Sequence, residues 1–193
     1  MKLILKVLIL LVFINTYSQE MMDENLPYYE IPDYPENFTA GTISARMLDG
    51  LGFRYYWATE GLREEDLNYK PSDESRTSGE TIDHILGLSH MIVNATLMKA
   101  NGNDGNEPEM TFEQKRERTL NNIKTAADIL RTSEDVSQYK LIFGTREVPF
   151  WNSINGPIED AVWHCGQIVL LRRSSGNPYN SNASVFSGKV RKE

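Results

Sequence analysis

The sequence predicts an all-α protein, a four-helix bundle with a short irregular or hairpin segment before its last helix. Four segments repeat apolar residues at the spacing of three and four that places them on one face of a helix. Three of these segments begin with residues that favour helix starts. The intervening loops of about ten to twenty residues are typical of helices that fold back on one another. We therefore expect one compact domain over residues 40–178.

Residues 1–18 are predicted to be a secretory signal peptide. Lys2 and Lys6 are followed by the apolar run Val7 to Ile14, and small residues precede the predicted cut. The run is shorter than the roughly 20 residues that span a bilayer. We therefore expect an exported protein, periplasmic or extracellular, that begins near Gln19 and has no membrane span after cleavage. An uncleaved signal anchor is the alternative.

The charge and cysteine content exclude several classes of protein. The chain has a formal net charge of −7, and residues 1–18 contain two lysines and no acid, so the remaining chain is more acidic still. No basic patch favours binding to nucleic acid or to an anionic membrane. The single cysteine, Cys165, cannot form an internal disulfide. We expect its thiol to be buried and inert rather than nucleophilic.

The chain after the signal peptide begins with residues 19–39, an acidic segment rich in tyrosine and proline. We expect this segment to lie extended across the body or to stay loose. The first predicted helix covers residues 40–62, where Gly50 and Gly52 would let a neighbour approach closely at some cost in helix propensity. Its aromatic group is expected to be core or dimer surface: Phe53, Tyr55, Tyr56 and Trp57. Its predicted apolar face is Ile43, Met47, Leu51, Ala58 and Leu62.

The second and third predicted helices both have clear starting signals. Ser78 opens the second helix, residues 78–100, as an N-terminal cap. The predicted apolar face of this helix consists of His84, Leu88, Met91, Ala95 and Met98. Thr111 and Gln114 form a predicted capping box for the third helix, residues 111–132. Its predicted buried seam is Leu120, Ile123, Ala127 and Leu130.

The remaining residues contain a predicted hairpin, the last helix and a tail. In the irregular region 134–156, apolar residues on both sides of Gly144 predict a short hairpin. The fourth helix is predicted over residues 157–175, with Pro157 at its first position. The sequence Gly176-Asn177-Pro178 would end it. We expect the tail, residues 179–193, to pack weakly.

Three side chains of metal-binding type are predicted to meet between two helices. Asp160 and His164 are four residues apart and therefore stack on one face of the last helix. His84 lies in an apolar face, where a buried imidazole needs a polar partner. Two imidazoles and one carboxylate suit zinc, nickel, iron or manganese and leave open positions for water. Such a metal would lower the pKa of bound water or thiol and polarise a substrate carbonyl.

Several alternatives remain open for these residues. The polar line of the last helix, which also contains Gln167, could simply face water. Glu80, one turn before His84, could orient that histidine or serve as a fourth ligand, although an acid at a helix start explains it equally well. His90 lies about 240° around the helix from His84 and is expected to be structural or exposed. Ring nitrogens of His84 more than about 7 Å from both other residues would exclude a shared metal.

Three stretches of residues 40–178 form a recognisable set of motifs. The first is the loop Glu64-Glu-Asp-Leu-Asn-Tyr-Lys-Pro71, and the second is Ser78-Gly-Glu80 with His84 four residues later. The third is His164-Cys-Gly-Gln167 on the last predicted helix. These stretches are moderately specific together and weak individually. Through them, most of residues 40–178 resemble the DinB-like family of four-helix-bundle metalloproteins.

The resemblance implies a metal triad of one histidine early in the second helix and two histidines four apart in the last. His84 and His164 match the first and the last of these, and Asp160 stands in place of the middle histidine. The harder carboxylate oxygen changes metal preference and weakens binding of nickel or zinc. Family members with assigned activity resemble metal-dependent transferases acting on low-molecular-weight thiols, such as maleylpyruvate isomerases and bacillithiol transferases.

Two hypotheses of different classes follow from the sequence. In the first, the protein is an exported enzyme that binds one divalent metal through His84, Asp160 and His164 and catalyses thiol transfer or hydrolysis on a small molecule. In the second, the chain is a metal-free helical module that has kept the fold, lost the site, and binds a partner or a second copy of itself. The aromatic and glycine content of the first helix makes a homodimer plausible.

Overall fold

The computed structural model describes residues 26–102 and 109–192, and the predicted signal peptide lies outside these residues. The described chain is mainly helical and has two small antiparallel strand pairs. The all-α prediction is therefore confirmed in its coarse form. The four long helices are α2 (Ala40–Thr59), α4 (Ser78–Thr96), α5 (Phe112–Arg131) and α7 (Glu159–Ser174).

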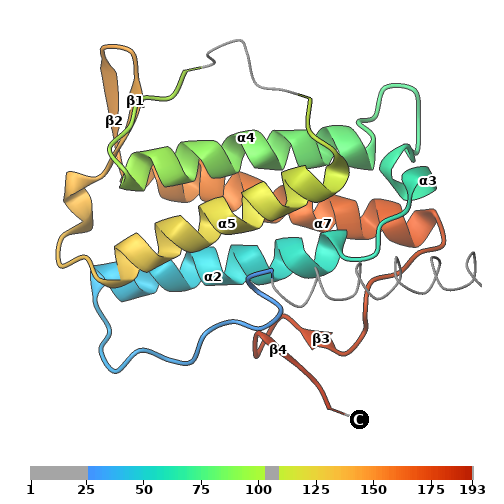
Figure 1. Ribbon diagram of the computed structural model, residues 1–193, viewed down its shortest axis with the longest axis horizontal. Coiled ribbons are helices and arrows are strands. Elements are labelled where there is room, and N and C mark those ends of the chain that lie inside the picture. The colour runs from blue at the N-terminus through green and yellow to red at the C-terminus, as the bar shows by residue number, and fades with distance from the viewer. Residues whose placement is uncertain (1–25, 103–108, 193) are drawn as a thin grey trace, which may run out of the picture.

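The four long helices enclose one apolar core. Helices α2 and α4 each pack against both α5 and α7, so that α5 and α7 lie on opposite sides of the arrangement in Figure 1. Helices α4 and α7 run in opposite directions. The largest apolar side chains in the core have no more than 2 % of their surface exposed: Phe53, Tyr55, Leu48, Leu51, Ile82, Ile85, Leu120, Ile123, Leu130, Ile158 and Ile168. The predicted seam of the third helix is confirmed, since all four of its residues are fully buried.

Helix α2 begins where the sequence predicts and ends three residues earlier. Thr39 and Thr42 cap its start reciprocally, with each backbone N–H donating to the other side chain, at 2.8 and 3.1 Å. The aromatic group is buried and is therefore core. The predicted apolar face is wrong at Ile43, which is 52 % exposed. The buried face instead includes Ala45 and Leu48, because α5 and α7 both cover this helix.

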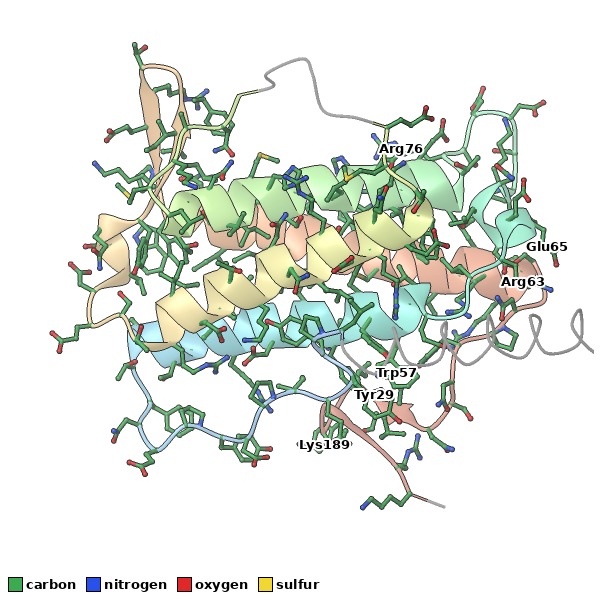
Figure 2. All side chains as sticks on the ribbon, viewed as in Figure 1. Tyr29, Trp57, Arg63, Glu65, Arg76 and Lys189 are labelled. Carbon is green, nitrogen blue, oxygen red and sulfur yellow. The ribbon has the colours of Figure 1, made fainter. Side chains whose placement is uncertain are left out.

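Part of the amino-terminal segment lies across α2. The Tyr28 ring packs so closely on Gly52 that a Cβ atom there would lie 2.3 Å from it, so the close approach predicted for this glycine is observed. The Trp57 indole donates to the backbone oxygen of Tyr29 at 3.1 Å, and Figure 2 shows these two side chains next to each other. Tyr28 is only 5 % exposed. The segment therefore extends the core.

The tail packs against this same segment, contrary to the expectation of weak packing. Strands β3 (Ala183–Ser184) and β4 (Lys189–Val190) pair with each other. The backbone N–H of Ile31 donates to the Gly188 oxygen at 2.9 Å, and Lys189 forms an ion pair with Glu30 at 3.2 Å. No periodic pattern predicts this contact, because strands of two residues are too short to show one.

The region before the last helix contains the predicted hairpin and an unpredicted kink. Strands β1 (Lys140–Phe143) and β2 (Arg146–Pro149) pair around Gly144, which has a φ of 59°. A short helix α6 (Trp151–Ser153) and a π-type turn η2 (Ile154–Ile158) follow. Pro157 lies inside that turn, directly after the non-helical Gly156, so it is the first helical residue after the kink, as predicted, although regular α-helix is assigned only from Glu159. Gly156 departs from helical geometry, with φ −94° and ψ −109°, and regular α-helix resumes at Glu159.

Smaller differences concern the ends of helices. Helix α4 ends at Thr96, four residues before the predicted end, because Met98 adopts a left-handed conformation with a φ of 54°. The loop after α2 contains a four-residue helix, α3 (Glu64–Leu67). In residues 26–102 and 109–192, no helix combines the length and the apolar character needed to cross a membrane.

A buried polar network closes one end of the molecule. Arg172 is 2 % exposed and donates to the backbone oxygens of Trp57, Ala58 and Glu60, at 3.1, 3.0 and 2.9 Å. These oxygens lie at the end of α2, where helix carbonyls lack partners within the helix. Next to this site, the fully buried Asp66 accepts hydrogen bonds from three side chains. We call this set the Asp66–Arg172 network: Arg63, Asp66, Arg172, Ser175 and Asn177.

Candidate metal centre

The three predicted ligands come from neighbouring helices. Asp160 lies in the first turn of α7 and His164 one turn later, on the same face. His84 lies in the second turn of α4. The two helices are antiparallel, and η2 packs against α4 just before α7 begins. The first turns of α7 therefore lie beside α4, where the three side chains meet.

The side chains meet at contact distance. His84 Nε2 lies 3.0 Å from Asp160 Oδ2, and His164 Nε2 lies 3.3 Å from Asp160 Oδ1. The two imidazole rings are nearly perpendicular, with centroids 4.6 Å apart and an interplanar angle of 83°. One ligand atom from each residue lies within 4.8 Å of the other two. Each carboxylate oxygen of Asp160 therefore faces a different histidine.

This cluster is partly open to solvent. The side chains of His84 and Asp160 are 35 % and 37 % exposed, while that of His164 is 13 % exposed. Ile85 and Leu88, which follow His84 in α4, are buried in the core. The cluster therefore lies at the surface of the helix pair, where a solute can reach it, and His164 is the most enclosed of the three.

The donor atoms lie close enough together to be gathered around a single divalent ion. Zinc binds histidine nitrogen and carboxylate oxygen at about 2.1 Å, so two ligands of a tetrahedral ion lie about 3.4 Å apart. The separations of 3.0 and 3.3 Å run to the two different oxygens of Asp160, and one donor atom from each residue lies within 4.8 Å of the other two, so small movements of the side chains would give this spacing. Two imidazoles and a carboxylate also form a donor set that first-row divalent metals accept. The His84 ring nitrogen lies well within the limit of about 7 Å beyond which a shared metal would be excluded.

Gln167 is a functional candidate to which the sequence assigned no role. Its Oε1 lies 2.8 Å from His164 Nδ1, the ring nitrogen that faces away from Asp160. Gln167 follows His164 by three residues, a spacing that places the two side chains together on a helix. Metal-bound histidines commonly donate from their second nitrogen to such an acceptor. The spacing of three residues between His164 and Gln167 was therefore the sequence signal that could have identified this contact.

The other candidates lie outside the cluster. Glu80 accepts a hydrogen bond from the Thr77 backbone at 2.7 Å and caps α4, so its place at a helix start explains it. His90 is half-buried on α4 and does not join the three ligand side chains. Cys165 is 2 % exposed, and burial raises the pKa of its thiol to about 12. Its predicted burial is confirmed. Among the described residues, only His84, Asp160 and His164 form such a group.

Comparison with known proteins adds no relative to this picture. No family model, no curated protein and no solved structure matches the chain. A functional assignment therefore depends on the chemistry of the chain's own side chains.

Proposed function

We propose that the protein binds one divalent metal ion through His84, Asp160 and His164 and acts on a small molecule, by thiol transfer or by hydrolysis. The observation that carries this proposal is the convergence of two imidazole nitrogens and a carboxylate within 4.8 Å at a solvent-accessible surface. Zinc, nickel, iron and manganese all accept this donor set. When bound, the metal would supply a Lewis acid that activates water or a thiol and polarises a carbonyl.

The chain's own residues would divide the work of holding the ion. The two histidines supply Nε2 atoms from facing helices, so the ion would join α4 to α7. Asp160 supplies the harder oxygen ligand and offsets part of the positive charge of the ion. The exposure of His84 and Asp160 leaves one side of the cluster accessible to a substrate.

The arrangement of the helices supports a DinB-like four-helix bundle as the fold behind this site. Of the motif residues, Glu64 begins α3, Ser78 begins α4, and His164 to Gln167 lie on α7. Thiol transfer enters this proposal from that resemblance alone, which is a likeness of fold and motif. Export enters it from the sequence of residues 1–18.

The first experiment is elemental analysis of residues 19–193, purified without a metal-binding tag. We expect about one equivalent of a transition metal, as a site with three protein ligands implies. The His84→Ala and His164→Ala variants should lose the metal and keep their helical circular dichroism. His90→Ala is the matched control, because it removes a histidine of α4 outside the cluster. A chain that takes up no zinc, nickel or manganese, or uptake retained in both variants, would contradict the proposal.

A second candidate function is a metal-free module that binds a partner or a second copy of the chain. It is favoured by large apolar side chains on the outer face of α7, where Trp163 is 72 % and Leu170 64 % exposed. In this case, His84 and His164 would simply donate hydrogen bonds to Asp160 and hold α4 against α7. Sedimentation of the wild type and of Trp163→Glu tests self-association: a wild-type dimer that dissociates in the variant supports it, and a wild-type monomer opposes it.

A further inference from the structure

We infer that Gln167 is a positioning residue for the metal centre, an inference that rests on the proposed function of His164 as a ligand. Its amide oxygen accepts the hydrogen of His164 Nδ1. This contact selects the ring form whose Nε2 lone pair points toward Asp160, where the ion would bind.

The chemistry of the imidazole ring gives the reason. A neutral imidazole carries hydrogen on one nitrogen and a lone pair on the other. The separation of 2.8 Å between Nδ1 and Gln167 Oε1 is that of a hydrogen bond. When Nδ1 is the donor, Nε2 holds the lone pair. This Nε2 atom lies 3.3 Å from Asp160 Oδ1, so the lone pair and a carboxylate oxygen face the same point.

A competing arrangement satisfies the same distances without a metal. In it, His164 carries its hydrogen on Nε2 and donates to Asp160, while the amide of Gln167, rotated by half a turn, donates its N–H to Nδ1. An amide can play either part, whereas a carboxylate can only accept. The replacement of Gln167 by glutamate, which keeps the acceptor, therefore separates the two arrangements.

The two histidines differ in how firmly they are held. His164 is 13 % exposed and contacts a partner through each of its nitrogens, Gln167 and Asp160. Among the described residues, Asp160 is the only hydrogen-bonding partner of the His84 side chain, which is 35 % exposed. Because Gln167 and His164 belong to the same helix, the hydrogen bond between them does not depend on the packing of α4. His164 is thus the prearranged ligand, and His84 is the one that adapts.

The tautomer can be measured directly in the metal-free protein. Long-range ¹H–¹⁵N spectra at about pH 8.5, well above the pKa of about 6.5 of an unperturbed imidazole, distinguish hydrogen on Nδ1 from hydrogen on Nε2. We expect hydrogen on Nδ1 of His164 in the wild type and in Gln167→Glu. In Gln167→Leu, which removes the acceptor and keeps the size, the hydrogen should move to Nε2. Hydrogen on Nε2 in the wild type would overturn the inference.

Zinc titration supplies the second readout. Loss of an outer hydrogen-bond partner of a metal ligand costs about 10- to 100-fold in affinity. Gln167→Leu should weaken zinc binding by that factor, and Gln167→Glu should retain it. Gln138→Leu is the control, because Gln138 is an exposed glutamine that precedes β1 in the sequence. This variant should bind zinc like the wild type. Equal zinc affinity in Gln167→Leu and the wild type would overturn the inference. The expected tautomers in a chain that binds no zinc would support the positioning role and refute the metal function.

Discussion

The Asp66–Arg172 network and the His84–Asp160–His164 cluster are both polar groups that join distant parts of the chain, yet they are built in opposite ways. In the network, Arg172 is 2 % exposed and Asp66 is fully buried, and protein donors and acceptors surround both. In the cluster, the side chains of His84 and Asp160 are each slightly more than one third exposed, at 35 % and 37 %. The network is closed to solutes, and the cluster is open to them.

This difference shows how a fold separates stability from binding. A buried charge must be compensated by the protein itself, because no solvent can reach it. The network meets this requirement, so it has no capacity left for a ligand. The cluster brings three side chains together at a partly exposed surface with few protein donors, so we expect it to stabilise the fold weakly, and the proposed ion would bind there. Three substitutions test this contrast.

The largest expected effect is on stability, from Arg172→Met. This change keeps an unbranched apolar stem and removes the guanidinium, leaving three backbone oxygens at the end of α2 without this donor. Breaking a buried charged contact of this kind costs about 3 to 5 kcal/mol in the free energy of unfolding. Urea unfolding followed by circular dichroism measures it.

Arg173→Met is the matched control, because Arg173 is the exposed neighbour in α7, and its guanidinium lies 5.4 Å from the centroid of the Tyr179 ring. We expect it to cost about 1 kcal/mol or less. An equal effect of the two changes would show that the end of α2 finds other donors, and the contrast between closed and open groups would fail.

A smaller effect on stability is expected from Asp66→Asn. The Arg63 guanidinium, with Ser175 and Asn177, holds the pKa of the Asp66 carboxyl well below its usual range. A lowered native pKa stabilises the fold above the unfolded value of about 3.9, and the stabilisation is lost as pH falls through the native value. The variant should lose about 2 kcal/mol near neutral pH, since hydrogen bonds to charged groups contribute about this much. It should also depend less on pH than the wild type below about pH 4.

Urea unfolding at about pH 7 and about pH 3 gives both quantities. Glu65→Gln is the control, because Glu65 forms an ion pair with the same Arg63 from a position 67 % exposed, and both side chains are labelled in Figure 2. It should change stability by less than about 1 kcal/mol. A pH profile of Asp66→Asn identical to that of the wild type would mean that the carboxylate of Asp66 does not stabilise the fold.

The smallest expected effect concerns metal preference, from Asp160→His. An imidazole in place of the carboxylate softens the donor set and should raise affinity for zinc or nickel, relative to manganese, by about tenfold, or about 1.4 kcal/mol. Competition titrations with pairs of metals measure this ratio. Asp83→His is the control, because Asp83 precedes His84 on α4 and forms an ion pair with Lys115 instead. An unchanged ratio in Asp160→His would show that residue 160 is not a ligand.

Much of the helical framework could be predicted because it depends on local signals. Thr111 and Gln114 form the expected capping box, and the seam of α5 is buried as its spacing predicts. The meeting of His84, Asp160 and His164 also agrees with their helical phase, although their binding of a metal stays a prediction. Helical phase is a local property, and the packing of two amphipathic helices preserves it.

What could not be predicted depends on contacts between residues far apart in the chain. Asp66 and Asn177 are separated by 111 residues, and no local pattern marks them as partners. Ile43 occupies a position that periodicity assigns to the core, and it is exposed because the neighbouring helices cover a different face. Pro157 has the sequence features of a helix start and is the first helical residue after the kink at Gly156, but the π-type turn that contains both residues was not predicted.

The kink at Gly156 has a consequence for how the length of this chain can vary. In an unbroken helix, each added residue turns everything attached to it by about 100°. Here the hairpin β1–β2 and α6 precede the kink, while Asp160 and His164 follow it on a helix held by its packing against α4. Insertions or deletions at the Gly144 turn should therefore leave the rotation of α7 about its axis unchanged. The hairpin is the natural place to graft a foreign loop while the three ligand side chains keep their orientation.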